Sequence, residues 1–266
     1  MRLCISVVCL AIAITFSSAA SAETVCTLVE EAQTGRVIKS EGDCATRTTP
    51  ASSFKLALSL MGYDAGILTD AHSPAWPYKP EYLSTHEEWK QIIDPAKWLE
   101  YSVVWYSQVL TTKLGMDRFR GYVEKFDYGN KDVSGNPGKN DGLTEAWLSS
   151  SLQISPVEEA RFVHKMLTGN LPVSKDAVTK TMAIVPSWTL ADGIVVHGKT
   201  GTGVPRGPDG ILDPAGGIGW FVGWAEKRER RYVFARLIRQ DKLAGAGLVA
   251  RDTLKADLPA LLANER

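Results

Sequence analysis

Residues 50–62 read PASSFKLALSLMG, in which a proline turn leads into an almost uninterrupted apolar run. The run predicts a buried helix that starts near Ser52 and is broken by Gly62. Ser52 and Lys55 lie three positions apart, so their side chains share one helix face within hydrogen-bonding reach. Burial should lower the pKa of this lysine and make its free amine available at neutral pH. The pair predicts an activated serine, although a capping serine and a solvated lysine would give the same pattern.

A second motif, Lys199-Thr200-Gly201, falls at the end of a predicted strand and is followed by Thr202-Gly203. Side chains at such a strand edge can face a cleft beside a helical region. Taken alone, the tripeptide is equally compatible with an ordinary strand end. Its position roughly 145 residues after the first motif is the order found in serine enzymes with a Ser-x-x-Lys nucleophile.

The segment before the proline turn predicts a β-hairpin. Val25–Glu30 and Arg36–Glu41 have strand character and are joined across residues 33–35, Gln-Thr-Gly. Opposed residues then have numbers that sum to about 70, which places Cys26 opposite Cys44, within disulfide range. We therefore predict a Cys26–Cys44 disulfide, and two free buried thiols are the alternative.

The first 22 residues have the layout of a cleavable secretory signal peptide. Met1 and Arg2 precede an apolar run over residues 3–16, and small residues end in Ala20-Ser21-Ala22. The run is shorter than the roughly twenty residues of a membrane-spanning helix. The mature protein is therefore expected to begin at Glu23, to be periplasmic or secreted, and to have no membrane association after cleavage.

Charge and composition exclude several classes of function. The chain has 30 basic and 30 acidic residues, and loss of Arg2 leaves 29 against 30, so nothing predicts a nucleic-acid-binding surface. No metal site is predicted, because the four histidines are scattered without ligand spacing: His72, His86, His164 and His197. The oligomeric state stays open, since no heptad repeat or single apolar face stands out.

Helices and loops alternate between the two motifs. The helix signals are an N-cap followed by proline, a capping box, and glycines at helix ends. The predicted helices begin at Asp94-Pro95, end near Leu114-Gly115, and span Asp117–Phe126, Ser155–Gly169 and Lys175–Val185, with long loops at Ala65–Asp94 and Tyr128–Gly142.

The C-terminal part predicts antiparallel strands at residues 188–191, 194–198, 218–225 and 232–238, then a closing helix at Leu248–Leu262. Strands at both ends with helices between them predict an α/β (α+β) fold. It consists of an antiparallel sheet built from both termini, flanking helices and an inserted all-helical lobe. We expect a single domain over residues 23–266, with a sheet lobe at 23–50 and 186–266 and a helical lobe at 51–185.

Six motifs occur in the order in which one enzyme family has them. They are Pro50–Lys55, Ser102-Val103-Val104-Trp105, Tyr128-Gly129-Asn130, Trp147-Leu148, Lys199-Thr200-Gly201 and Trp220–Trp224, with His197 two residues before Lys199. On these residues the mature chain resembles the class D β-lactamases, or oxacillinases, over essentially its whole length. Ser53 is a mild departure, because that family commonly has threonine there.

The resemblance implies a serine β-lactamase or transpeptidase-like fold and hydrolysis of penicillin-type β-lactams, which confers resistance. Ser52 would attack the lactam carbonyl and form an acyl-enzyme. Lys55 would react reversibly with carbon dioxide to give N6-carboxylysine, the general base for acylation and deacylation, and no other cofactor is implied. Trp147 would donate its indole N–H to this carbamate, although a lone tryptophan is more often a core residue.

The resemblance also assigns proton transfer and part of the pocket. Ser102 would pass a proton between Lys199 and the leaving nitrogen. A helix N-cap is the alternative reading of Ser102. Val104 would line the pocket beside the carbamate.

The remaining implied residues bind substrate. The backbone N–H groups of Ser52 and Thr202 would form the oxyanion hole. Thr200 and Gly201 belong to the binding strand. Arg251 would pair with the substrate carboxylate alongside Thr200, and a surface ion pair with a neighbouring acid is its alternative.

Three related classes of protein compete with this reading. A class A β-lactamase would need Ser-Asp-Asn and a deacylating glutamate, whereas this chain has Ser102-Val103-Val104. Cell-wall transpeptidases usually carry Ser-x-Asn and further domains. A β-lactam sensor domain, which stays acylated, shares the fold and most motifs. A sensor must be tethered to a membrane, and this chain is expected to be free of it once cleavage follows Ala22.

Overall fold

The computed structural model describes residues 22–207, 209, 211–214 and 216–265. The predicted signal peptide, apart from Ala22, lies outside the described residues. Within the described ranges, none of the helices has the length and apolar character needed to cross a membrane.

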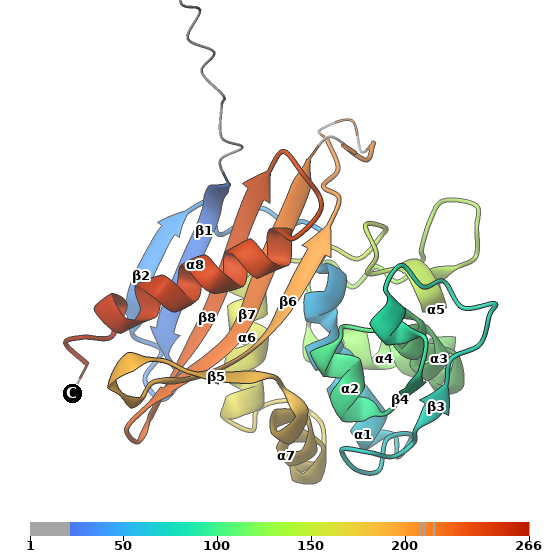
Figure 1. The fold of residues 1–266 in the computed structure, drawn as a ribbon, viewed down its shortest axis with the longest axis horizontal. Helices are drawn as coiled ribbons and strands as arrows, with labels where there is room; N and C mark the ends of the chain where they lie inside the picture. The colour runs from blue at the N-terminus through green and yellow to red at the C-terminus, as the bar shows by residue number, and fades with distance from the viewer. Residues whose placement is uncertain (1–21, 208, 210, 215, 266) are drawn as a thin grey trace, which may run out of the picture.

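A six-stranded antiparallel sheet organises the chain, with strand order β2-β1-β8-β7-β6-β5. Its strands are β1 (Glu23–Glu31), β2 (Val37–Gly42), β5 (Ser187–Thr189), β6 (Val195–Gly203), β7 (Gly217–Lys227) and β8 (Arg230–Gln240). The N-terminal β1 pairs with the C-terminal β8, so the two ends of the chain share one sheet (Figure 1). The predicted sheet built from both termini is confirmed.

The sheet is covered on both faces. Helix α8 (Ala246–Leu261) crosses one face, and the remaining helices lie on the other side of the sheet or beside it (Figure 1). Side chains alternate along β7, so Phe221 packs in the core under α8 while Trp220 and Val222 pack in the larger core toward the helices. Burial on both faces explains why this strand reads as a nearly continuous apolar run.

Most of the helices between β2 and β5 lie beside the sheet, together with two short strands, whereas α6 (Pro156–Leu167) packs on the sheet against β1, β7 and β8 (Figure 1). The helices are η1 (Ala51–Phe54), α1 (Lys55–Asp64), η2 (Glu87–Trp89), α2 (Pro95–Glu100), α3 (Val104–Leu114), α4 (Met116–Phe126), α5 (Gly142–Glu145), α6 and α7 (Lys175–Ile184), and the strands are β3 (Trp76–Pro77) and β4 (Ile92–Ile93). A last turn, η3 (Ala191–Gly193), joins β5 to β6. The predicted capping box at the start of α6 is confirmed, with Ser155 and Glu158 as its two members.

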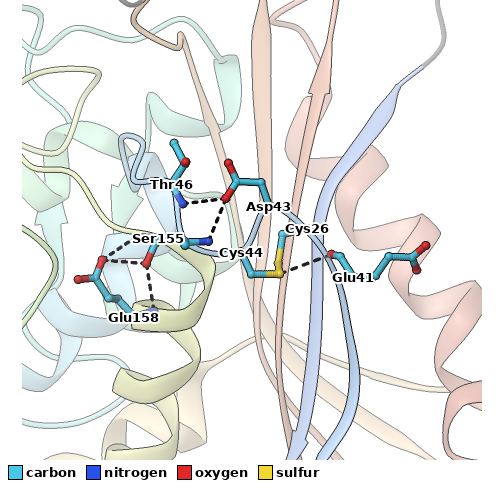
Figure 2. Close-up of a disulfide and its surroundings, with 8 residues drawn as sticks. Cys26, Glu41, Asp43, Cys44, Thr46, Ser155 and Glu158 are labelled. Carbon is cyan, nitrogen blue, oxygen red and sulfur yellow. Dashed lines mark hydrogen bonds between the residues drawn. A yellow bond between two sulfur atoms is a disulfide. The ribbon is translucent and has the colours of Figure 1, made fainter.

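The Cys26–Cys44 disulfide is present, with the two Cα atoms 5.0 Å apart (Figure 2). The register used to predict it is wrong by two residues, because Cys26 pairs with Gly42. Gly35 closes the turn in a left-handed conformation, so the hairpin is centred before it. Cys44 lies beyond the end of β2, in a turn where the Asp43 carboxylate accepts hydrogen bonds from the backbone N–H groups of Ala45 and Thr46.

Three local predictions need correction. The nucleophile segment begins as the 3-10 turn η1, and the α-helix starts only at Lys55. Gly62 does not break α1, which continues to Asp64. Glycine at this position makes room for the Leu68 side chain, which a Cβ would meet at 2.8 Å. The Lys-Thr-Gly motif lies inside β6 rather than at the end of a strand.

Candidate active site

Ser52 and Lys55 meet where η1 passes into α1. Lys55 Nζ lies 2.9 Å from Ser52 Oγ. Lys55 is fully buried, whereas Ser52 is partly exposed. Ala51, just before the serine, has a φ of 49°, a left-handed value that is uncommon for a residue with a Cβ. The serine is therefore presented from a tight, conformationally demanding turn.

The surroundings of Lys55 favour its neutral amine. Burial lowers the pKa of Lys55 well below its usual value, and the charge of Lys199 lowers it further. Among the described residues, no carboxylate forms an ion pair with Lys55. A neutral amine at hydrogen-bonding distance from a hydroxyl can accept the hydroxyl proton.

A second lysine and serine pair joins the sheet to the helical region. Lys199, in β6, donates to Ser102 Oγ at 2.9 Å and to the Thr200 carbonyl at 3.0 Å. Burial lowers the pKa of Lys199 to about 7, so it can gain or lose a proton near neutral pH. The two pairs place two serine hydroxyls and two weakly basic amines in one region.

Ser102 does not cap a helix. Val103 is the N-cap of α3, and it contributes no side-chain cap. Ser102 itself has a φ of 58°, which turns its hydroxyl toward Lys199. Val104 is the first residue of α3 and is partly buried against the main core.

Trp147 lies under the nucleophile turn. It is fully buried, and its ring centroid is 5.7 Å from that of Phe54 and 6.2 Å from that of Phe119. Its indole Nε1 has no hydrogen-bond partner among the described residues. A buried donor without an acceptor costs free energy, so this N–H is suited to receive an anion.

Strand β6 runs directly against the nucleophile turn. A Cβ placed on Gly201 would lie 2.9 Å from the Pro50 carbonyl oxygen and 3.3 Å from Ser52 N. Only glycine allows this approach, which sets the β6 backbone beside the Ser52 backbone. Thr200 is partly exposed, and Thr202 is exposed with its Oγ1 accepting from Gly247 N at 3.0 Å.

Arg251 lies on α8, one helical turn after Gly247, which packs against β6. Its guanidinium pairs with Asp252 at 2.8 Å and lies 5.4 Å from the ring of Trp188, a residue of the edge strand β5. The surface ion pair, the alternative interpretation of Arg251, is the arrangement observed.

One group near the site was not singled out from the sequence. Glu159 of α6 is fully buried, and its Oε1 lies 2.6 Å from Ser53 Oγ and 2.9 Å from the Tyr128 hydroxyl. The sequence did hold a signal, because Glu159 falls on the same apolar helix stripe as Val163 and Met166. A carboxylate on an apolar stripe indicates a buried polar role.

Comparison with known proteins agrees with the order of these motifs. Residues 25–258 match the family model described as the penicillin binding protein transpeptidase domain. "Beta-lactamase OXA-9" of Klebsiella pneumoniae is 47% identical over 90% of this chain and 89% of its own length. The crystal structure of the OXA-427 class D β-lactamase superposes with a TM-score of 0.84 at 49% identity, covering 90% of this chain and 98% of that one.

A methicillin resistance protein is also similar at lower identity. The "Methicillin resistance mecR1 protein" of Staphylococcus aureus is 31% identical over 78% of this chain, but the match covers only 33% of its own length. The β-lactamases match over nearly their whole length and at higher identity. The chain therefore belongs to the class D β-lactamases, within the wider family that carries the penicillin binding protein transpeptidase domain.

Proposed function

We propose that this protein hydrolyses the β-lactam amide of penicillin-type antibiotics through an acyl-enzyme on Ser52. The observation that carries the proposal is the fully buried Lys55 amine, 2.9 Å from the serine hydroxyl. Once carboxylated, this lysine can take the serine proton as the oxygen attacks the lactam carbonyl. The relatives' names support the same substrate class and a role in antibiotic resistance.

Acylation breaks the lactam C–N bond, and the departing nitrogen needs a proton. The Ser102 hydroxyl can deliver it and be resupplied by the Lys199 ammonium group at 2.9 Å. Because the pKa of Lys199 is lowered to about 7, both its ammonium and its amine forms are populated near neutral pH. The backbone N–H groups of Ser52 and Thr202 would stabilise the carbonyl oxygen during attack.

The residues around Lys55 fit a carbamate formed from carbon dioxide. Carbamate formation requires a neutral amine, and the resulting anion requires a donor in a dry pocket. Lys55 provides the first and the unpartnered Trp147 indole N–H the second. A carboxylated Lys55 would supply the base that activates water for deacylation, and the same Trp147 N–H would orient it.

Substrate binding is assigned to the β6 edge. Thr200 and Gly201 lie beside the nucleophile turn, and Val104 begins the helix that follows Ser102. We assign no substrate contact to Arg251, which lies against Asp252 and Trp188. The ligand is a small β-lactam molecule.

We further propose that the protein is exported, with cleavage after Ala22 leaving it periplasmic or secreted. The sequence pattern of residues 1–22 supports export. N-terminal sequencing of the protein recovered from the periplasm or medium tests the cleavage site, and a mature N-terminus upstream of residue 20 would contradict it.

Steady-state hydrolysis of a penicillin panel by the wild type and Lys55→Ala, with and without bicarbonate, tests the catalytic proposal. We expect multiple turnovers for the wild type, stimulation by bicarbonate after decarboxylation at low pH, and no steady state for Lys55→Ala. One equivalent of product without further turnover would instead identify a β-lactam sensor domain. A wild-type rate unaffected by bicarbonate would count against the carbamate.

A further inference from the structure

Glu159 places a carboxyl group behind the nucleophile turn, on the first turns of α6. Two hydroxyl oxygens contact its Oε1, that of Tyr128 at 2.9 Å and that of Ser53 at 2.6 Å. The Ser53 hydroxyl also lies 2.7 Å from the Pro50 carbonyl oxygen. The other carboxyl oxygen, Oε2, has no partner among the described residues. The group is buried on all sides.

The number of protons in this chain of oxygens determines the state of Glu159. Three short oxygen–oxygen contacts need three protons, one in each. Tyr128 and Ser53 have one each, and the Pro50 carbonyl has none. A protonated Glu159 supplies this third proton if it donates to Ser53 Oγ while Ser53 donates to Pro50. An ionised Glu159 would leave two oxygen lone pairs facing each other across one contact.

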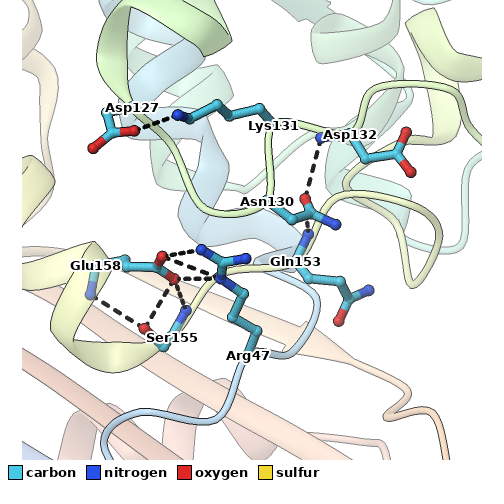
Figure 3. A network of polar contacts seen from close by, with 8 residues as sticks. All are labelled: Arg47, Asp127, Asn130, Lys131, Asp132, Gln153, Ser155 and Glu158. Carbon is cyan, nitrogen blue, oxygen red and sulfur yellow. Dashed lines mark hydrogen bonds and ion pairs between the residues drawn. The ribbon is translucent and has the colours of Figure 1, made fainter.

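The charges around Glu159 favour the same protonated form. Among the residues described, no lysine, arginine or histidine pairs with it. Its neighbour Glu158 points outward and pairs with Arg47, as Figure 3 shows, so a second negative charge lies nearby. Burial, reinforced by the Glu158 charge and only partly opposed by the Ser53 and Tyr128 hydrogen bonds, raises the pKa of Glu159 to about 7. The pKa of Tyr128 is itself raised well above its usual value by burial and by Glu159, so Tyr128 stays a donor.

We propose that Glu159 acts as a neutral carboxylic acid and is a positioning residue for the Ser52 nucleophile. Its proton fixes the Ser53 hydroxyl on the Pro50 carbonyl, which closes the turn around Ala51 and Ser52. This carbonyl also lies against Gly201 of the Lys-Thr-Gly strand. The Glu159 proton therefore controls how the serine backbone is held against β6.

Ionisation of Glu159 would rearrange the chain of donors. The Ser53 proton would turn from the Pro50 carbonyl to the carboxylate, and the Pro50 carbonyl would lose its side-chain donor. The strained turn at Ala51 would then lose one of the contacts that closes it. We expect Ser52 to acylate more slowly in this state.

Infrared spectroscopy of the whole protein with isotope-labelled glutamate tests the protonation state directly. At about pH 6 the wild type should show a carboxylic-acid band that is absent in Glu159→Gln and present in Glu158→Gln. Glu158 is a matched control on the same helix, because its hydrogen bonds with Arg47 and Ser155 outweigh its burial and lower its pKa to about 2. The measurement uses no substrate, so it can fail or succeed independently of the proposed hydrolase function on which the positioning role rests.

Acylation rates with a chromogenic β-lactam test the positioning role. The ratio of the Glu159→Gln rate to the wild-type rate should rise about five- to tenfold between about pH 6 and about pH 9, because glutamine stays neutral. A ratio cancels the contributions of Lys55 and Lys199, which both proteins share. Glu158→Gln should keep the pH dependence of the wild type, with its midpoint moved to lower pH, because the Glu158 charge helps to raise the pKa of Glu159.

Ser53→Ala, or Glu159→Ala if it folds, should lower the acylation rate about tenfold at both pH values. A carboxylate at Glu159 near pH 6 would overturn the proposal. An unchanged ratio of the Glu159→Gln to the wild-type acylation rate across the pH range in which the carboxyl group titrates would also overturn the proposal, since Glu159 would then be structural only.

Discussion

The Lys199 amine lies 2.9 Å from the Ser102 hydroxyl, although 97 positions separate the two residues. Lys199 belongs to the sheet and Ser102 to the link between α2 and α3, so their contact joins the two parts of the molecule. The backbone at Ser102 adopts a left-handed conformation to make it. Backbone strain of this kind persists where the surrounding structure holds a side chain in a required direction.

Ser102→Ala should therefore slow acylation of Ser52 by about 100-fold, because the leaving nitrogen loses its proton donor. Lys55 stays next to Ser52, so deacylation of any adduct should change much less. Stopped-flow measurement of the burst and steady-state phases separates the two steps. Ser107→Ala, on a buried α3 serine that accepts from Trp98, is the control for simple loss of a hydroxyl in this region. Equal effects of both substitutions would remove the proton-transfer role.

Trp147→Phe should trap the acyl-enzyme. Phenylalanine retains the packing against Phe54 and Phe119 but has no N–H to offer an anion at Lys55. We expect deacylation to slow at least tenfold, with acylation changed far less. Intact-mass spectra after mixing with a penicillin should show accumulated adduct. Trp98→Phe, whose indole N–H bonds Ser107 inside the core, is the matched control. A Trp147→Phe protein that accumulates no adduct would argue against this role.

The low pKa of Lys199 predicts how stability depends on pH. Its pKa is about 7 in the folded protein and about 10.5 when unfolded, so the unfolded chain binds more protons between these values. The contribution of Lys199 should therefore raise the free energy of unfolding as pH rises from about 7 toward 10. Lys199→Met removes this contribution and should be more stable than the wild type at pH 7. Above pH 7 its free energy of unfolding should rise less steeply with pH than that of the wild type. Urea unfolding across this range measures the slope, and equal slopes would contradict the buried amine.

The sequence predicted those parts of the site that depend on local spacing. Ser52 and Lys55 lie three apart at a helix start, and Lys199 lies in a strand with regular pairing, so motif order was sufficient for both. The hairpin register was missed because it depends on where Gly35 closes the turn, which composition alone does not specify.

Features that depend on tertiary packing were harder to predict from the sequence. The family resemblance implied the Ser102 to Lys199 contact, whereas local spacing could not, because 97 positions separate the two residues. Glu159 was not singled out, because its contacts with Ser53 and Tyr128 join residues that lie far apart in the sequence. The close approach of Gly201 to the nucleophile turn likewise appears only once β6 and η1 are packed.

The disulfide should contribute to stability by limiting the unfolded chain. Cys26 and Cys44 are 18 residues apart, and closing a loop of this length stabilises by about 3 kcal/mol in the chain-entropy account. The Cys44 carbonyl also accepts from Val157 N at the start of α6, so the bridge anchors the segment that leads to Ser52. The double substitution of both cysteines by alanine should lower the free energy of unfolding accordingly in urea titrations. A loss below about 1 kcal/mol would mean that the native contacts alone hold this segment.

Arg251→Ala tests whether the Arg251 guanidinium contributes to substrate binding or only to stability. The guanidinium lies against Trp188 and Asp252. The substitution should leave kcat/KM for a penicillin within about twofold of the wild type, because an ion pair to a substrate carboxylate would be worth far more. It should lower the free energy of unfolding by about 1 kcal/mol through loss of the contact with Trp188. Thr200→Val, on the β6 edge, is the comparison that should raise KM. If Arg251→Ala instead raised KM tenfold or more with unchanged stability, the guanidinium would have to leave Trp188 during substrate binding, and the carboxylate contact implied by the family resemblance would be restored.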